Sequence, residues 1–128
     1  MSKILIVGEH ANGKLNPAIA KCVSCAANIS GAEIHIAIFA ADANAVATQA
    51  AALSKVAKVL KIENAANAEP LAAVLAPQVT ALAANYTHVF GPSTTFGKDL
   101  MPRVAALLGV GQLSDIMAVE SPYRFRRP

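Results

Sequence analysis

The chain has 128 residues, of which 55% are hydrophobic, 15% charged and 5% aromatic, and this composition suits one globular domain with a single sizeable core. The formal net charge of +3 matches the contribution of Arg124, Arg126 and Arg127, so the rest of the chain is neutral and offers no broad cationic face to nucleic acid. No apolar run approaches the roughly 20 residues needed to cross a bilayer, and the N-terminus lacks a secretory signal pattern, so we expect no membrane insertion and a cytoplasmic location.

Short apolar runs alternate with alanine-rich amphipathic stretches from one end of the chain to the other. The short, β-branched runs predict buried strands, and the stretches between them predict helices. In chain order, the predicted elements are a strand at Lys3–Gly8, a helix from Pro17 to about Ser30, a strand at Glu33–Phe39, a helix from Asp42 to about Ser54, a strand at Val56–Ile62, a helix from Pro70 to about Asn85, a strand at Thr87–Phe90, a helix from about Phe96 to Leu108 and a strand at Ile116–Val119.

Several predicted helices carry local signals for their starts. Asn16 is placed as an N-cap with Pro17 in the first helical position, where its missing N–H costs nothing. Asp42 can cap the next helix in the same way. Pro77 and Pro102 fall inside predicted helices, where we expect a kink or a bend.

Strands that alternate with helices require right-handed crossovers and therefore a mainly parallel sheet covered by helices on both faces. We predict a three-layer, doubly wound α/β fold. One domain is expected to span residues 1–121. Residues 122–128, which include the aromatic and cationic sequence Tyr123–Arg127, are expected to connect it to another domain or to pack on a partner rather than to hold single-stranded nucleic acid.

Two polar, glycine-bearing loops follow the first and fourth predicted strands. In open α/β sheets, ligands sit at the carboxyl ends of strands where the strand order reverses, because neighbouring loops diverge there and leave a crevice. The second loop also leads into a helix N-terminus, whose free N–H groups favour an anion. A small nucleotide or another anion is therefore one expected ligand, in a crevice lined by Gly8, Asn12, Gly13, Gly91, Ser93, Thr94, Thr95 and Lys98.

The first of these loops, Gly8–Lys14, matches the G-x-x-x-x-G-K pattern of a phosphate-binding P-loop. Leu15 stands where that motif needs a hydroxyl to hold Mg²⁺. In the second loop the two glycines lie one residue too far apart, and Asp99 replaces the hydroxyl. Neither loop therefore predicts a P-loop nucleotidase.

The remaining reactive side chains give no catalytic set. Cys22 and Cys25 form a C-x-x-C pair in the middle of a predicted helix, away from the N-terminus that would lower a thiol pKa, and no further ligands complete a zinc site, so we expect two reduced thiols and no metal. His35 and His88 lie in predicted strands and are expected to be satisfied in the core or at its edge. His10 follows the first strand, where an exposed turn residue is favoured over one that meets a ligand. We expect no enzymatic activity.

Two stretches of the chain resemble the electron-transfer flavoprotein alpha subunit family. The first joins Lys3–His10 to Asn12–Pro17, and the second, which is more specific, is Tyr86–Leu108. Gln112–Ile116 and Phe125–Pro128 continue the likeness in register.

The resemblance implies an N-terminal domain of the adenine-nucleotide-alpha-hydrolase type that pairs with a related beta subunit and packs beneath a flavin-binding domain absent from this chain. The complete protein would carry electrons through FAD, from flavin dehydrogenases to a quinone oxidoreductase or another acceptor. The family's flavin contacts belong mostly to the absent domain, so the resemblance implies no FAD on this chain alone. Surface left uncovered by a missing partner gives a reason to expect some homodimer of the isolated domain.

Overall fold

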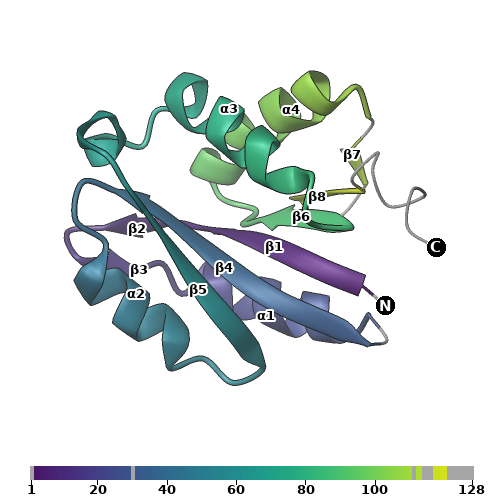
Figure 1. Ribbon diagram of the computed structural model, residues 1–128, viewed down its shortest axis with the longest axis horizontal. Coiled ribbons are helices and arrows are strands. Elements are labelled where there is room, and N and C mark those ends of the chain that lie inside the picture. Colours follow the sequence, from purple (N-terminus) through teal and green to yellow (C-terminus); the bar gives the residue numbers. More distant parts are fainter. Residues whose placement is uncertain (1, 30, 111, 114–116, 121–128) are drawn as a thin grey trace.

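The computed structural model describes residues 2–29, 31–110, 112–113 and 117–120. Its centre is a six-stranded sheet with the strand order β5-β4-β1-β6-β8-β7, covered by helices on both faces (Figure 1). The strands of this sheet are β1 (Ser2–Gly8), β4 (Ala32–Ala40), β5 (Val56–Glu63), β6 (His88–Gly91), β7 (Gln112–Leu113) and β8 (Met117–Glu120). The helices are α1 (Ala18–Ala27), α2 (Asn44–Ala51), α3 (Ala72–Ala83) and α4 (Thr95–Leu108), with a short 3-10 helix, η1 (Ala65–Ala68).

The sheet is mainly parallel, as predicted. β1 lies between β4 and β6, with Ile4 opposite Ile34 on one side and His88 on the other. β5 extends the parallel part beyond β4, whereas β8 runs antiparallel to β6, and β7 antiparallel to β8. The last predicted strand is thus confirmed as β8, while Ile116 and the predicted tail at 122–128 lie outside the described residues.

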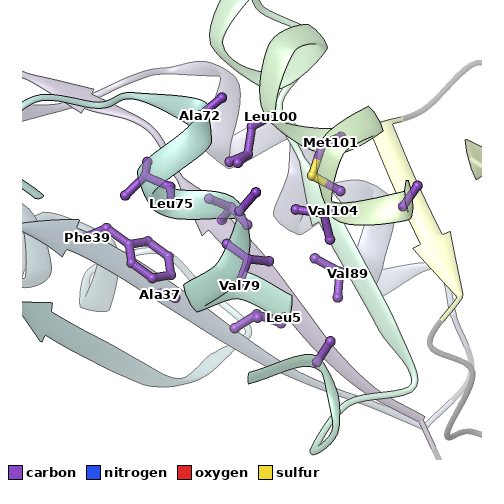
Figure 2. Packing of buried hydrophobic residues seen from close by; sticks show 14 of the residues in the cluster. Leu5, Ala37, Phe39, Ala72, Leu75, Val79, Val89, Leu100, Met101 and Val104 are labelled. Atoms are coloured by element: carbon purple, nitrogen blue, oxygen red, sulfur yellow. The ribbon is translucent and has the colours of Figure 1, made fainter. Parts of the chain in front are cut away.

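Alternate side chains of β1 point to opposite faces of the sheet, so this strand contributes to two cores. Ile4 and Ile6 pack with residues of α1 and α2. Leu5 and Val7 belong to the core under α3 and α4, where Figure 2 shows Leu5 facing side chains of both helices. All four side chains are fully buried, and burial of each one contributes about 1.5–3 kcal/mol.

The first two helices cover one face of the sheet, and the last two cover the other. The chain moves outward from β1 through β4 to β5, with α1 and α2 on one face, and then returns through α3 on the other face to enter β6 beside β1 (Figure 1). The strand order therefore reverses between β1 and β6.

The segment after β1 is predicted as a loop, and this prediction is wrong. The segment is a β-hairpin of β2 (His10–Ala11) and β3 (Lys14–Leu15). Asn12 and Gly13 form its turn with φ of 54° and 74°. An Asn-Gly pair adopts this left-handed conformation readily, so the dipeptide itself was a sufficient signal for the hairpin.

The predicted N-caps are wrong by one residue, because the N-caps of α1 and α2 are Pro17 and Ala43, and neither makes a side-chain cap hydrogen bond. α1 begins after Pro17 rather than at it, yet the side chain of Asn16 accepts a hydrogen bond of 2.8 Å from an N–H of the first turn. Asp42 does the same before α2, at 3.0 Å. α3 and α4 continue through Pro77 and Pro102, so neither proline ends its helix.

The predicted elements do not include η1, which follows β5. Its Asn67 is buried and exchanges two hydrogen bonds with the side chain of Gln78 in α3, at 3.0 and 2.7 Å. This pair fixes the chain between β5 and α3 onto the helix, and α3 begins at Ala72, after Pro70 rather than at it.

Candidate functional site

The chain leaves the ends of β1 and β6 in two different directions. β1 ends at Gly8 and leads through the hairpin to α1, whereas β6 ends at Gly91 and leads to α4 on the opposite face of the sheet. Since β1 and β6 are neighbours, their carboxyl ends form a switch point, the place where open α/β sheets bind ligands. The structure thus brings the two predicted loops together.

A short hydrogen bond joins these loops across the switch point. Thr94 is the N-cap of α4, and its hydroxyl donates to Glu9 Oε1 at 2.6 Å while accepting from the N–H of Gly97 at 3.2 Å. The helix dipole favours a carboxylate at this end of a helix. An anion therefore already lies at the start of α4, and it belongs to the protein. Glu9 is not among the predicted crevice residues, and its place directly after the strand end is the one local signal for it.

Two hollows flank this hydrogen bond. The first, the α1 hollow, has a volume of about 320 Å³ and lies between α1 and the end of β6. Its lining is mostly apolar and consists of Ala18, Lys21, Cys22, Cys25, Phe90, Gly91, Ser93 and Thr94. Of the predicted crevice residues, Gly91, Ser93 and Thr94 meet here.

The second hollow, the α4 hollow, has a volume of about 260 Å³ and lies at the start of α4, on the other side of the Glu9–Thr94 hydrogen bond. Its lining residues are Glu9, His10, Ala11, Pro70, Ala72, Thr95, Phe96 and Asp99. Among the described residues, two carboxylates and no lysine or arginine line it, and Asp99 forms an exposed ion pair with Arg103 at 3.4 Å. This lining does not suit a phosphate.

The other predicted crevice residues do not share one hollow. Thr95 lines the α4 hollow, and Lys98 is exposed on α4 and lines neither hollow. Asn12 and Gly13 are exposed at the hairpin turn, which is held against α2 because the side chain of Gln49 donates to the carbonyl of Gly13 at 2.7 Å. The predicted group is therefore divided between the two sides of the switch point and the hairpin.

The glycines of the predicted crevice have packing or backbone roles. A Cβ atom on Gly8 would lie 2.5 Å from Ile38 Cδ1, and one on Gly91 would lie 2.7 Å from the Met101 side chain. Gly13 takes the left-handed conformation of the hairpin turn. No ligand is needed to explain any of the three.

A larger and shallower groove, of about 690 Å³, lies away from the switch point between α2 and the outer strand β5. Lys58 and Lys61 line it, and Lys61 Nζ donates to Asn44 Oδ1 at 2.9 Å. Lysines on an outer strand hinder pairing with a strand of another molecule, and this role accounts for both of them.

His10 is half-buried, and its expected place as an exposed turn residue is wrong. Its Nε2 donates to the carbonyl oxygen of Phe39 at 2.9 Å, and because a carbonyl can only accept, the proton lies on Nε2. The hydrogen bond ties β2 to β4, which gives His10 a structural function beside the α4 hollow.

Cys22 and Cys25 are free thiols that line the α1 hollow together. Cys22 is buried, and this burial, with a smaller contribution from the neighbouring Cys25, raises the pKa of its thiol to about 11. Cys25 is exposed. A raised pKa disfavours the thiolate that nucleophilic attack and metal binding require, so the structure favours a packing role for Cys22.

His35 is a buried and fully hydrogen-bonded histidine, as predicted. Its Nε2 donates to Glu33 Oε2 at 2.6 Å, and its Nδ1 lies 2.7 Å from the hydroxyl of Tyr86. This network lies at the amino ends of the strands, far from the switch point. Burial, and in second place the charge of Glu33, raise the pKa of the Tyr86 phenol. His88 is likewise bonded, with Nδ1 2.9 Å from the hydroxyl of Thr87.

Within the described ranges, no three or more His, Cys, Asp and Glu side chains gather as a metal site. The same part of the chain contains no helix that is long and apolar enough to span a membrane.

FAD is the cofactor that the family resemblance implies for a complete protein, and the described residues do not fit it. An FAD pyrophosphate needs a helix N-terminus or glycine-rich backbone that is free to receive negative charge. Here Glu9 holds the start of α4, and Asp99 lines the neighbouring hollow. The two hollows, about 320 and 260 Å³ in volume, are also at the small end of ligand pockets, which enclose about 300–1,000 Å³.

Fold and site together define a doubly wound α/β domain whose switch point is closed by its own side chains. The electron transfer flavoprotein domain family matches residues 4–128. The chain belongs to this family.

The relatives are alpha subunits, so the predicted resemblance is confirmed. The chain is 45% identical over 125 residues to the electron transfer flavoprotein subunit alpha of Pseudomonas aeruginosa, and 40% identical over 126 residues to that of Paracoccus denitrificans, with 98% of this chain covered in each case. It is 29% identical over 134 residues, 99% of this chain, to the mitochondrial subunit alpha of Dictyostelium discoideum. The chain spans only 38–40% of the length of these relatives.

Proposed function

We propose that this chain is the scaffold and subunit-pairing domain of an FAD-containing electron-transfer flavoprotein alpha subunit. The observation that carries the proposal is the family match over residues 4–128, together with the alpha-subunit relatives. Because the chain spans about 40% of the length of those relatives, the flavin of a complete protein would be held by the remaining part. The domain would contribute shape and contacts rather than redox chemistry.

The complete protein would receive electrons from flavin dehydrogenases and pass them through FAD to a quinone oxidoreductase or another acceptor. Its partner subunit would be a related beta subunit, and its location would be cytoplasmic. FAD, when bound, supplies the electron-accepting ring. This chain's own residues build the two cores that hold the domain in shape, and the beta subunit would dock onto that domain.

The internal bonding of the polar side chains supports a scaffold. In the described part of the chain, no buried side-chain nitrogen or oxygen lacks a hydrogen-bond partner. Cys22 is held in its protonated form, and His35 has a partner on each nitrogen. Side chains prepared for catalysis more often show strained or incompletely paired polar groups, so this bonding pattern favours a structural function.

Flavin retention tests the scaffold assignment directly. The purified 128-residue chain is incubated with excess FAD and passed through a gel-filtration column, and we expect all visible flavin absorbance to elute separately from the protein. The electron transfer flavoprotein that contains the Pseudomonas aeruginosa subunit alpha serves as the positive control. Flavin that elutes with the 128-residue chain would overturn the proposal.

Subunit pairing has its own test. Analytical ultracentrifugation of the chain alone and with an added flavoprotein beta subunit should show a heterodimer that replaces any homodimer of the isolated domain. A chain that sediments unchanged in the presence of the beta subunit would remove the pairing function.

The alternative is a binder of small nucleotides or other anions at the switch point. The hydroxyls of Ser93 and Thr94 at the start of α4 favour it, whereas the carboxylates of Glu9 and Asp99 oppose it. Calorimetry with ATP and AMP at millimolar concentration separates the two functions, because saturable heat of binding would favour the alternative and its absence would favour the scaffold.

A further inference from the structure

We propose that Asn12 is a site of spontaneous deamidation, and that the side chain of Gln49 slows this modification by holding the β2–β3 hairpin closed. Water is the only other reactant, and the products are ammonia and an aspartyl or isoaspartyl residue at position 12. The inference goes beyond the proposed function and does not depend on it.

The reaction joins the two residues of the hairpin turn. The backbone nitrogen of Gly13 attacks Cγ of the Asn12 side chain, so that a C–N bond forms and the bond from Cγ to Nδ2 breaks. The amide group takes up the proton that Gly13 loses and leaves as ammonia. Water then opens the cyclic succinimide at one of its carbonyls, which gives aspartate, or at the other, which gives isoaspartate and directs the main chain through the side-chain carbon.

The first support is the residue that follows the asparagine. Asn12 is the only asparagine in the sequence that precedes a glycine, and glycine has no side chain to hinder ring closure. The other asparagines precede a proline, which has no N–H to react, or a residue with a Cβ atom. They are Asn16, Asn28, Asn44, Asn64, Asn67 and Asn85.

The second support is the open surroundings of the turn. Asn12 and Gly13 are both exposed, and a Cβ atom on Gly13 would meet nothing within 4 Å. Within the part of the chain that the structure describes, neither the N–H of Gly13 nor the side-chain amide of Asn12 has a hydrogen-bond partner. The nucleophile is therefore unpaired, and there is space for the ring and for water.

The third support concerns the control of the rate. The φ angles of Asn12 and Gly13, 54° and 74°, belong to the closed turn, and ring closure requires the backbone between them to rotate out of it. β2 and β3 have two residues each, too few to hold a hairpin closed by themselves. Gln49 of α2, which lies beside the hairpin (Figure 1), donates to the Gly13 carbonyl at 2.7 Å and accepts from the N–H of Leu15 at 2.8 Å. Its side chain thus braces the turn on both sides.

The modification in turn weakens this brace. Isoaspartate adds a carbon atom to the main chain between Ala11 and Lys14, which are paired across the hairpin, and the tight turn cannot keep that pairing with a longer connection. The carbonyl of Gly13 then moves away from Gln49. We expect the isoaspartyl form to release the hairpin from α2.

The experiment measures deamidation at each asparagine by peptide mapping and mass spectrometry, after the 128-residue chain is incubated in mildly alkaline buffer. We expect Asn12 to react about tenfold faster than any other asparagine, because only its neighbour lacks a side chain. Gln49→Ala should raise the rate at Asn12 about fivefold, the factor by which the loss of one ordinary hydrogen bond shifts an opening equilibrium. Thr48→Ala is the matched control, because the exposed Thr48 hydroxyl bonds to Asn44 of the same helix, and it should leave the rate unchanged.

Two results overturn the inference. A rate at Asn12 no higher than at the other asparagines would remove the modification site, and equal rates in the unaltered chain and Gln49→Ala would remove the control by Gln49. When Gln49→Ala does not fold, a synthetic peptide of residues 9–16 replaces it, because the peptide contains the Asn-Gly pair without the brace. The peptide should deamidate faster than the chain, and an equal or lower rate would contradict the brace.

Hydrogen exchange tests the release of the hairpin. The N–H of Leu15 is the reporter, because it donates to Gln49 Oε1. We expect faster exchange at Leu15 in the purified isoaspartyl form than in the unaltered chain. Asn12→Asp is the control, since it carries the same added charge without the extra main-chain atom and should exchange like the unaltered chain. Unchanged exchange in the isoaspartyl form would show that the modification does not release the hairpin.

Discussion

The two ends of the sheet carry similar hydrogen-bond chains in different surroundings. At the amino end, His35 connects Tyr86 to the carboxylate of Glu33, and the His35 side chain is only 6% exposed. At the carboxyl end, Thr94 connects Gly97 to the carboxylate of Glu9, with a hollow on each side. Water can replace a lost partner of the half-buried Thr94 but not of the buried His35, although the Glu33 side chain is itself 44% exposed.

From this difference we expect the network at the amino end to contribute more to stability than the network at the carboxyl end. A buried polar group that loses its partner keeps the full cost of its desolvation, about 1–3 kcal/mol. A half-buried group that loses its partner finds water instead, so its removal should change stability less. The substitutions below test that contrast, in order of decreasing expected effect.

Gly97→Ala should lower stability the most, because it creates a steric clash at the carboxyl end instead of removing a single hydrogen bond. The new Cβ atom would meet the Pro92 carbonyl oxygen at 1.7 Å, and the backbone must move. We expect a loss of about 3 kcal/mol in the free energy of unfolding, measured by urea denaturation. Ser93→Ala, at an exposed neighbour, should cost less than about 0.5 kcal/mol. Similar values for the two variants would show that the loop relaxes at little cost.

Tyr86→Phe tests the buried chain at the amino end. It removes the hydroxyl that lies 2.7 Å from His35 Nδ1 and leaves that nitrogen without its partner in a buried place. The expected cost is about 2 kcal/mol. Glu33→Gln, alone and combined with Tyr86→Phe, completes a double-mutant cycle, and a coupling energy of zero would argue that the three side chains do not act as one network.

Thr94→Val tests the chain at the carboxyl end with a side chain of nearly the same shape. The N-cap of α4 is lost, and we expect a cost of about 1 kcal/mol, smaller than that of Tyr86→Phe because water reaches the freed groups. Thr95→Val is the control, since Thr95 is exposed and is not the cap. A cost above that of Tyr86→Phe would reverse the contrast between the two ends.

The smallest effect is a dependence of stability on high pH. The pKa of Tyr86 is raised above its ordinary value of 10.0 by burial, so the folded chain holds this proton more tightly than the unfolded chain does. The resulting stability is fully present below pH 10.0 and is lost as the pH rises through the raised pKa. Denaturation midpoints on both sides of this pH should fall less steeply for Tyr86→Phe than for the unaltered chain. Cys22 is present in both proteins, so the effect of its own raised pKa cancels in the comparison. Midpoints that fall equally steeply with pH in the two proteins would show that Tyr86 is not the source of the pH dependence.

Much of the fold could be predicted from the sequence because its signals are local. The β-branched runs of β1 and β4, the placement of Asn16 and Asp42 before their helices, and the alternation of strands and helices all depend on neighbouring residues. The hairpin also has a local signal, the Asn12-Gly13 pair, although the prediction gives this segment as a polar loop.

The candidate site depends on contacts that the sequence pattern does not reveal. Glu9 and Thr94 lie 85 positions apart, and His35 and Tyr86 lie 51 apart, so no local pattern pairs them. The switch point itself is predicted from the polar loops after the first and fourth strands, and Thr94 is among the residues predicted there. What could not be placed is the carboxylate that closes it, because its partner is determined only when β1 and β6 become neighbours. The start of α3 differs from the prediction for a similar reason, since Asn67 reaches Gln78 from another element.

The antiparallel direction of β8 has a consequence for engineering. Glu120 lies opposite His88, and His88 lies opposite Ile4, so β8 ends about 10 Å from Ile4 near the start of β1, two strand spacings away. A short peptide could join these two positions, and the exposed Asn12-Gly13 turn could serve as the new opening of a circularly permuted chain. Tags or fused proteins attached at the amino end of the sheet would lie on the side away from Glu9 and Thr94.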